Sequence, residues 1–296
     1  MFSTITILMF LVTITVAIAA QQAVPSTKAS KCGAAGKIVR LQDLPEASGV
    51  AASRRTPGVF WAHNDSGEPV IVALDSEGAV KGRVRVSGAS VHDWEDIAVG
   101  PCPQGGCVYI ADIGDNSGSR KRITLYRVPE PAPDDAKTSP VESFHAAYPD
   151  GARDAESLFV TRESDVFLIT KGDPGPIAVY RFPRPLASGT TLQLLQIGEP
   201  VAGPKTRAGD RPTGADVSPD GQWVAVRTTD WVAFHRTTDL VAGRWREAFR
   251  TDLSDLGEPR GEGVTYAGDD LILVGEGGSP FGGQGTFARL SCTSGR

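Results

Sequence analysis

The chain has 296 residues, of which 40% are hydrophobic and 22% charged, and its formal net charge is −5 at pH 7. This acidic balance argues against nucleic acid as a partner, because proteins that bind nucleic acid present strongly basic surfaces. The length allows one large domain or two small ones.

The first element is an uncharged apolar segment over residues 1–20, which ends in Ala17-Ile18-Ala19. Its length and the small residues at its end are typical of a secretory signal peptide rather than of a membrane anchor. We therefore predict a secreted or periplasmic protein, with a linker over residues 21–36 and a single domain over residues 37–296. No later apolar run approaches the length of a membrane span, so we expect none after signal cleavage.

Export favours disulfide bonds among the four cysteines. Cys102 and Cys107 flank the turn sequence Pro-Gln-Gly-Gly, which predicts a stapled hairpin, and Cys32 and Cys292 would then join the two ends of the domain. Four cysteines allow three pairings, so the connectivity is a hypothesis. Zinc is the alternative, but the spacings do not fit a zinc finger.

Five related segments recur along the chain, and each places a small or acidic pair before an apolar, strand-like run. They are ASGVAAS at 47–53, WEDIAVG at 94–100, AESLFVT at 155–161, GADVSPD at 214–220 and GEGVTYA at 261–267. We align them on Val50, Ile97, Leu158, Val217 and Val264. Internal repetition of this kind is the signature of a radially repeated fold.

Further short apolar runs follow each of these segments. Second strands are expected at 59–63, 107–112, 166–171, 223–228 and 271–276, third strands at 70–75, 123–128, 177–182, 231–236 and 286–291, and fourth strands at 80–86, 141–147, 191–197 and 245–251. The fifth unit lacks a fourth strand, which residues 37–44 can supply. We predict an all-β, five-bladed β-propeller whose N-terminal strand closes the last blade. A six-bladed propeller and a β-sandwich are the alternatives.

In a propeller, the start of each inner strand and the end of each second strand lie at the same end of the central channel. These positions are rich in acids, amides and histidine: His63, Asn64, Asp65, Asp93, Glu95, Asp96, Asp112, Asp115, Asn116, Asp154, Glu156, Asp216 and Glu262. Cations are also expected there, namely His92, Arg153, Lys171, Arg207, Arg211 and Arg260. The pattern therefore predicts an acidic mouth.

Clustered carboxylates and amides suit Ca²⁺ or another divalent cation, which takes six to eight oxygen ligands. The expected metal ligands are Asp65, Asp93, Asp96, Asp112 and Asp115. Paired carboxyls also suit hydrolysis, with one acting as an acid and one as a base, and the candidates are Glu95, Glu156, Glu262 and His92. An anionic group of a substrate would be held by Arg207, Arg211, Arg260 and His63.

Three hypotheses about function remain open at this point. The first is a metal-assisted hydrolase that acts on an extracellular carbohydrate or a phosphorylated ligand. The second is a non-catalytic propeller that binds a small-molecule, carbohydrate or protein ligand at the same mouth. In the third, the acids only accept backbone hydrogen bonds and hold the blades together. In each case we expect a monomer.

Several of the quoted segments are similar to a known group of proteins. The pairs ASGVAAS with VFWAHNDSG and WEDIAVG with VYIADIGDN, followed by AESLF and GEGVTY, resemble secreted bacterial propellers related to phytase-like and SdiA-regulated proteins. The resemblance covers most of the mature chain through short motifs. It implies a propeller with a calcium-associated acidic face and an activity toward phosphate or other esters.

Overall fold

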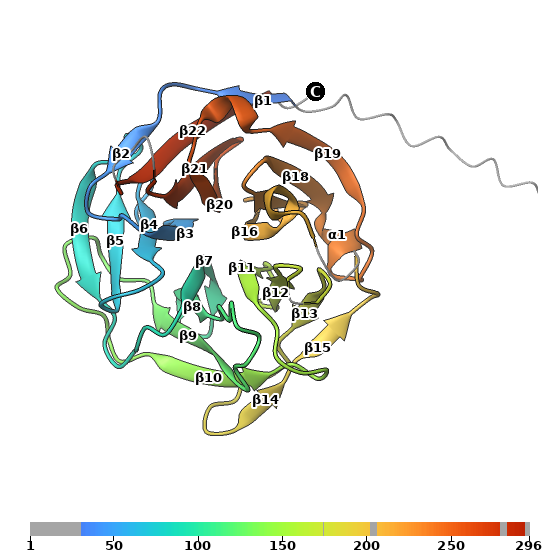
Figure 1. The fold of residues 1–296 in the computed structure, drawn as a ribbon. Helices are drawn as coiled ribbons and strands as arrows, with labels where there is room; N and C mark the ends of the chain where they lie inside the picture. Colours follow the sequence, from blue (N-terminus) through green and yellow to red (C-terminus); the bar gives the residue numbers. More distant parts are fainter. Residues whose placement is uncertain (1–30, 174, 202–205, 279–282, 294–296) are drawn as a thin grey trace, which may run out of the picture.

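The computed structural model describes residues 31–173, 175–201, 206–278 and 283–293. The predicted signal peptide at 1–20 lies outside the described residues. Within them, five sheets, antiparallel except for one outer strand pair, surround a central channel like the blades of a propeller, as Figure 1 shows. The predicted all-β, five-bladed propeller is confirmed.

The five innermost strands are neighbours of one another around the channel. They are β3 (Ala47–Ala52), β7 (Trp94–Cys102), β11 (Ala155–Val160), β16 (Pro212–Val217) and β20 (Arg260–Ala267). Each pairs with the strand that follows it in sequence. All five therefore run in the same sense along the channel, so their first residues meet at one end and their last residues at the other.

The remaining strands complete the blades outward from the channel. Second strands are β4 (Phe60–Asn64), β8 (Gly105–Asp112), β12 (Val166–Thr170), β17 (Trp223–Thr228) and β21 (Asp270–Glu276). Third strands are β5 (Val70–Leu74), β9 (Ile123–Pro129), β13 (Val179–Arg181), β18 (Trp231–Arg236) and β22 (Gly285–Thr293). Outer strands in the first, second and fourth blades are β6 (Val80–Arg85), β10 (Glu142–Ala147) and β19 (Glu247–Asp252).

The third blade departs from the expected pattern because residues 191–197 do not form one strand. Its first part, β14 (Thr191–Gln193), pairs in parallel with β10 of the second blade, whereas β15 (Leu195–Ile197) completes the third blade. Leu194 is buried between the two parts, and its amide donates to the carbonyl oxygen of Ala147. This stretch therefore links two neighbouring blades.

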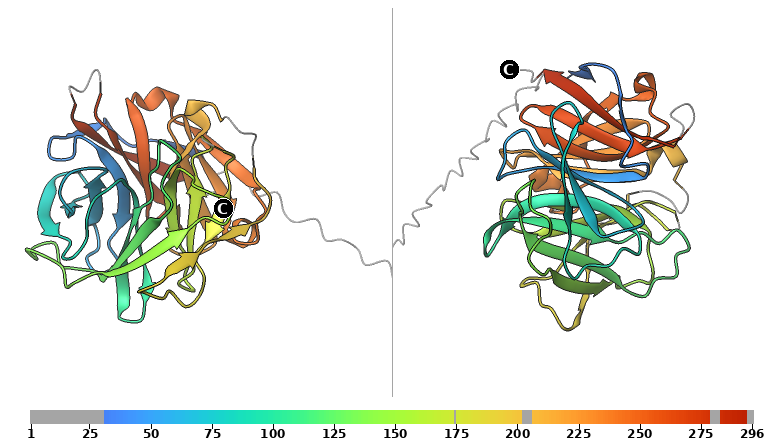
Figure 2. Two further views of the ribbon diagram at one scale, coloured as in Figure 1. Left: turned by 60° about the horizontal axis from the view of Figure 1, so that its bottom comes forward. Right: turned by 90° about the vertical axis from the view of Figure 1, so that its left-hand side faces the viewer.

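The N-terminal region closes the ring on the last blade, as predicted. Both β1 (Lys31–Ala34) and β2 (Val39–Leu41) pair with β22, and Figure 2 shows β1 lying beside β22. Residues 31–34, which we had assigned to the linker, thus belong to the sheet. The disulfide bond between Cys32 and Cys292 joins directly opposite residues of β1 and β22. The predicted bond between Cys102 and Cys107 is also present.

The core consists of five apolar clusters, one between each pair of neighbouring blades. Both faces of an inner blade strand are covered, so every residue of β11 and β12 is buried. Trp61 and Trp94 are fully buried between the first two blades. Helical structure in the described residues is limited to α1 (Thr237–Leu240) and to two single turns, η1 (Ala208–Asp210) and η2 (Ser254–Leu256). None of it could cross a membrane.

Candidate functional site: an acidic mouth

Each inner strand carries a β-bulge against its second strand near its first residues. In β7 the extra residue is Glu95, because Trp94 and Asp96 on either side of it face consecutive residues of β8. In β11 it is Glu156, because Ala155 and Ser157 face consecutive residues of β12. The other three bulges lie at equivalent positions. Bulges redirect side chains and often occur beside functional sites. Here they present one residue from every blade at the start of the channel.

The five presented residues are Ser48, Glu95, Glu156, Thr213 and Glu262. The two hydroxyls join neighbouring blades: Ser48 Oγ donates to the carbonyl oxygen of Glu95 over 2.6 Å, and Thr213 Oγ1 donates to that of Glu262 over 2.9 Å. The other three blades contribute carboxyl groups. The predicted equivalence of the three glutamates is therefore correct.

The fourth blade was aligned two residues too late in the sequence analysis. Ile97 is the second residue after Glu95, and in the fourth blade the residue with the equivalent pairing is Ala215 rather than Val217. Thr213, two residues before Ala215, therefore occupies the position that the three glutamates occupy in other blades. Asp216 does not reach the mouth. Its carboxylate accepts hydrogen bonds from the amides of Val217 and Tyr266 and from the Thr265 hydroxyl, and it faces the opposite end of the channel.

The inner strands approach one another closely just beyond the bulges. A Cβ atom at Gly49 would lie 2.7 Å from the amide nitrogen of Ile97 and 2.6 Å from Nε2 of His63. Only glycine fits there without displacing the neighbouring blade. Asp96 occupies the equivalent position in the second blade, where its side chain fills the space inside the ring.

Asp96 was predicted to bind a metal, but the structure gives its carboxylate a different role. One oxygen accepts from the amides of Leu158 and Ala215, at 2.8 and 3.1 Å, and the other accepts from the amide of Ile97 at 2.9 Å. Asp96 is fully buried and so holds the second, third and fourth blades together. This is the ring-stabilising role that the third hypothesis assigned to the acids, and Asp216 has a similar role between the fourth and fifth blades.

The chemically distinctive group at the mouth comprises Glu95, Asp154, Glu156, Glu262 and Lys171, which we call the acidic mouth. One carboxylate oxygen from each of Glu95, Asp154 and Glu156 lies within 4.8 Å of the others. The Lys171 ammonium forms ion pairs with Glu156 and, at 3.4 Å, with Asp154. All three of these carboxyl side chains are more than nine-tenths buried.

Burial and mutual repulsion strongly perturb these groups. Burial, followed by the charges of Glu156 and Asp93, raises the pKa of Glu95 well above its usual range. Burial raises the pKa of Glu156 to about 7, even though Lys171 opposes the shift. The pKa of Glu262 is also well above its usual range, through burial and the charge of Glu156. The carboxylates in turn raise the pKa of Lys171, which keeps it charged.

The turn after β8 closes one side of this group. A Cβ atom at Gly114 would collide with the carboxyl groups of Glu95 and Asp93, so glycine allows these two acids to lie beside each other. Asp115 caps the same turn by accepting from the amides of Ser119 and Arg120. Its own amide donates to Asp154 over 2.7 Å. The turn thus supports the mouth through its backbone.

Asp112 and Asp115 were predicted metal ligands, and their carboxylates are already engaged. Asp112 accepts from the amides of His92 and Asp93 and forms a 2.7 Å ion pair with Arg120. Neither residue belongs to the set of closely spaced ligand atoms found in the described part of the chain. Both instead stabilise the turn that lies beside Glu95 and Asp93.

Asp65 and Asp93 lie half-buried at the rim of the mouth. Burial and the charges of Glu46 and Glu276 raise the pKa of Asp65 to about 7. Burial and the charge of Asp154 raise the pKa of Asp93. These two predicted ligands thus lie in the same negative field as the three central carboxyls, without joining their closely spaced set.

The predicted substrate-binding residues are placed very differently from one another. Arg260 lies at the rim, where it forms a 2.6 Å ion pair with Glu276 and interacts electrostatically with Glu262. Arg207 is engaged by Asp210 and Asp230, and Arg211 by Asp173. The structure does not bring the last two into contact with the acidic mouth.

The two candidate histidines also differ. His63 is fully buried, its ring stands perpendicular to that of Trp94, and burial lowers its pKa to about 4. It therefore remains neutral and is not placed to touch a substrate in the channel. His92 is exposed on the outer side of the Asp112 loop, beside Arg120 and Thr124.

Two members of the acidic mouth, Asp154 and Lys171, had been placed at this end of the channel by sequence but given no role. Their backbones are joined, because the Lys171 amide donates to the Asp154 carbonyl oxygen. The available signal was the strand topology: Asp154 immediately precedes β11, and Lys171 immediately follows β12. The two residues are far apart in the sequence, but the hairpin of β11 and β12 places them next to each other.

Comparison with known proteins supports the fold and goes no further. No protein family and no curated protein matches the chain. Among solved structures, the PQQ-bound aldose sugar dehydrogenase of Streptomyces coelicolor is similar with a TM-score of 0.54 at 15% identity, over 92% of this chain and all of that one. The major allergen Mala s 1 of Malassezia sympodialis has a TM-score of 0.54 at 12% identity, over 87% and 97% of the two chains. The likeness to phytase-like and SdiA-regulated propellers remains a resemblance in short motifs.

The acidic mouth offers a suitable set of donors for a hard divalent cation. Calcium–oxygen distances of about 2.3–2.6 Å let two ligands of one ion stand up to about 5 Å apart, which the three central carboxyls satisfy. Asp154 Oδ2 is buried and has no hydrogen-bond partner among the described residues, apart from the nearby Lys171 charge. An oxygen left in this state is available to a cation.

Proposed function

We propose that this propeller is a hydrolase whose acidic mouth binds a divalent cation, with Ca²⁺ preferred, and cleaves an extracellular carbohydrate or phosphoester. The observation that carries the proposal is the pairing of two adjacent carboxyls in unlike surroundings. Glu156 is held next to a lysine, whereas Glu95 is surrounded by other acids. Such pairs, with pKa values pushed apart, supply the acid and the base of a hydrolytic reaction.

The reaction follows from these protonation states. Burial and the neighbouring carboxylates disfavour the charged form of Glu95, which makes it the candidate acid. It would give its proton to the leaving oxygen as the bond to carbon or phosphorus breaks. Glu156 would accept the proton of the attacking water, whose oxygen forms the new bond. A carboxyl with a pKa of about 7 is well matched to that exchange at neutral pH.

The cation would be held by the carboxylates of Asp154 and Glu156 and by the carbonyl oxygen of the protonated Glu95 carboxyl group, with Asp93 and Glu262 as the next oxygen donors. It would supply positive charge for an anionic or polyhydroxylated substrate in a mouth that otherwise repels anions. Among the substrate-binding candidates, Arg260 is the one that interacts electrostatically with acids of the mouth and its rim, namely Glu262 and Asp65. We assign it to an anionic group of the substrate.

An extracellular substrate is consistent with the covalent structure of the chain. Two disulfide bonds pair all four cysteines, and such bonds persist mainly in oxidising compartments. The signal-peptide pattern of residues 1–20 points the same way. We propose a secreted or periplasmic monomer.

The test is a screen of purified protein against polysaccharides and phosphoesters, with Ca²⁺ and with EDTA. We expect turnover that requires Ca²⁺ and falls at least about 100-fold in Glu95→Gln and Glu156→Gln. Glu77→Gln, in an exposed turn, is the matched control and should retain full activity. Unchanged activity in both mouth variants would exclude these residues as the acid and the base.

A second candidate function is non-catalytic ligand binding at the same mouth. It is favoured by Lys171, which already neutralises part of the carboxylate cluster and could keep it intact without turnover. The same screen separates the two. Ligand binding that depends on Glu156, measured by calorimetry and without product formation, would support the binding function and contradict the hydrolase.

A further inference from the structure

The opposite end of the channel contains a cavity of about 620 Å³. It is lined by the last residues of inner strands, including Ala51, Val99 and Val217, and by Phe60 at the start of β4. Its volume is within the range of small-molecule sites. The acidic mouth lies at the first residues of the same strands, so the two sites are at opposite ends of the channel.

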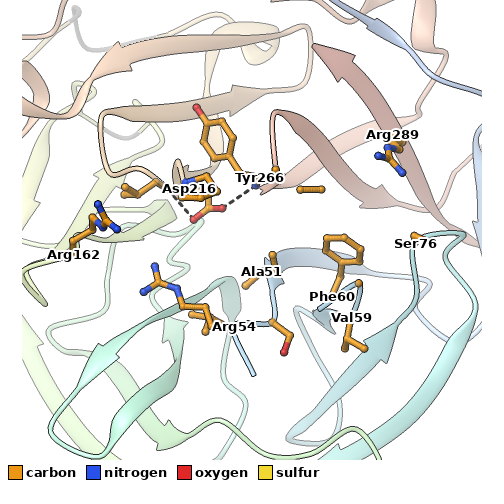
Figure 3. Close-up of a pocket in the computed structure, with 17 residues that line it drawn as sticks. Ala51, Arg54, Val59, Phe60, Ser76, Arg162, Asp216, Tyr266 and Arg289 are labelled. Atoms are coloured by element: carbon orange, nitrogen blue, oxygen red, sulfur yellow. Dashed lines mark hydrogen bonds between the residues drawn. The ribbon is translucent and has the colours of Figure 1, made fainter. Parts of the chain in front are cut away.

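The charge of this cavity is the reverse of that of the mouth. Arg54, Arg162 and Arg289 line it, and Asp216 is the one acid among its lining residues. Arg289 is already paired with Asp270 over 2.7 Å. In Figure 3, Arg54 and Arg162 lie on the same side of the cavity as Asp216, and Arg289 lies on the other side. We call this site the basic cavity.

Arg54 and Arg162 retain unused donors. Arg162 donates from Nη1 to the carbonyl oxygen of Asp220 over 3.0 Å. The Arg54 guanidinium has no hydrogen bond or ion pair to any residue that the structure describes. Asp216 forms no ion pair with either arginine among the described residues, although the charge of Arg54 acts on its carboxyl group, and its oxygens accept hydrogen bonds from other groups. Two guanidinium groups therefore border an apolar space.

A buried acid fixes the segment that carries Arg54. Glu130 is more than nine-tenths buried, and it accepts from the Ser53 hydroxyl at 2.5 Å and from the Trp61 indole at 2.9 Å. The same carboxylate accepts from the amides of Arg54 and Arg55, at 3.3 and 3.2 Å. This arrangement holds the backbone of Arg54 and leaves its side chain at the cavity. Preorganisation of this kind is typical of binding sites.

A further polar group at the cavity is unsatisfied. Tyr266 is 8% exposed, and its hydroxyl has no hydrogen-bond partner among the described residues. It lines the basic cavity and a second, adjoining one of about 340 Å³. A buried hydroxyl without a partner is costly, and a bound molecule could satisfy it.

We infer that the basic cavity is a second ligand site, which binds a small organic anion with a flat apolar body. Arg54 and Arg162 hold the carboxylate, sulfonate or phosphate group, because guanidinium groups recognise such anions through paired hydrogen bonds. Phe60 and the aliphatic strand ends contact the body of the ligand. This inference does not depend on the proposed hydrolase activity.

The test is calorimetric titration of the purified full chain, in EDTA and at low ionic strength. The probes are naphthalene-2-sulfonate, naphthalene-2-carboxylate and, as the neutral analogue, 2-naphthalenemethanol. We expect one molecule of anion to bind per chain, and the neutral analogue to bind at least about tenfold more weakly. The tighter of the two anions identifies the preferred group. Equal affinity for the neutral analogue would overturn the inference.

Variants locate the site. Arg54→Gln and Arg162→Gln should each weaken anion binding about tenfold, whereas Arg244→Gln, an exposed ion-paired arginine on the fourth blade, should leave it unchanged. Circular dichroism would confirm that each variant folds. Unaltered binding in both cavity variants, or an equal loss in Arg244→Gln, would contradict the assignment. Glu156→Gln should bind the anion normally, and a loss there would place the probe at the acidic mouth instead.

Discussion

The two ends of the central channel are made by the same five inner strands, yet they differ in how their charge is supplied. At the acidic mouth, the charged groups lie on the repeat itself, because the bulges of β7, β11 and β20 present Glu95, Glu156 and Glu262. At the basic cavity, the strand ends are apolar and the cations come from the connections, as Arg54 and Arg162 do. The inner strands thus supply the charges of one site, and the connections that follow them supply the charges of the other.

This difference affects both energetics and chemistry. The mouth carboxyls are buried with a single lysine, so they repel one another and their pKa values rise. The cavity arginines are exposed, so water solvates their charges. The mouth therefore favours bound cations or protons, whereas the cavity favours anions. Four predictions test this contrast, and they are arranged from the largest expected effect to the smallest.

The largest effect is expected from removing the aspartates that brace the blades. Asp96→Ala leaves three buried amides of three blades without an acceptor, and we expect the free energy of unfolding to fall by about 4–5 kcal/mol. Asp216→Ala, at the cavity end, also loses three hydrogen bonds, but it is partly exposed and should cost about 2–3 kcal/mol. Urea denaturation measures both values. Equal losses in unfolding free energy would mean that the two aspartates stabilise the two ends of the channel to the same extent.

Removing the one cation of the acidic mouth should give the next largest effect. Lys171→Met leaves Glu156 and Asp154 without their ion pairs, and we expect a loss of about 3 kcal/mol in EDTA. Added Ca²⁺ should recover more stability in this variant than in the parent protein, since the ion no longer competes with the ammonium. Lys81→Met, on an exposed outer strand, is the control. If Ca²⁺ stabilises neither the variant nor the parent protein, the proposed metal site at the acidic mouth is contradicted.

The sequence revealed the repeated end of the channel better than the other end. The five blades, the closure by residues 37–44 and the equivalence of Glu95, Glu156 and Glu262 could all be predicted, because each is encoded in local, repeated patterns. The fourth copy was misaligned because Thr213 is not acidic, whereas Asp216-Val217 has the expected order of an acidic residue followed by an apolar one. Arg54 and Arg162 occupy equivalent positions in the first and third blades, each four residues after the aligned residues Val50 and Leu158. That both line one cavity depends on the closed ring, which brings the connections of non-neighbouring blades to the same end of the channel.

The pH dependence of stability should come mainly from the acidic mouth. Burial raises the pKa of Glu156 from 4.5 to about 7, so the folded protein binds more protons than the unfolded chain in that interval. The resulting stability is fully present below pH 4.5 and is lost as the pH rises through 7, with about 2–3 kcal/mol of the loss falling between pH 5 and pH 8. Denaturation at pH 5 and pH 8 measures it. Glu156→Gln should lose less stability over this range than the parent, and Ca²⁺ should stabilise the parent more at pH 8 than at pH 5. An unchanged pH dependence in the variant would contradict the assignment.

The smallest effect is expected at the support of the basic cavity. Glu130→Gln keeps one acceptor oxygen but turns an amide group toward the backbone amides of Arg54 and Arg55, so we expect a loss of about 1 kcal/mol in unfolding free energy. Because Arg54 becomes less fixed, naphthalene-2-sulfonate should bind about threefold more weakly, while the effect of Ca²⁺ on stability stays the same. Glu142→Gln, which alters an exposed ion pair with Arg127, is the matched control. A change in the Ca²⁺ response, with unchanged anion binding, would show that Glu130 acts on the mouth and that the two ends are not independent.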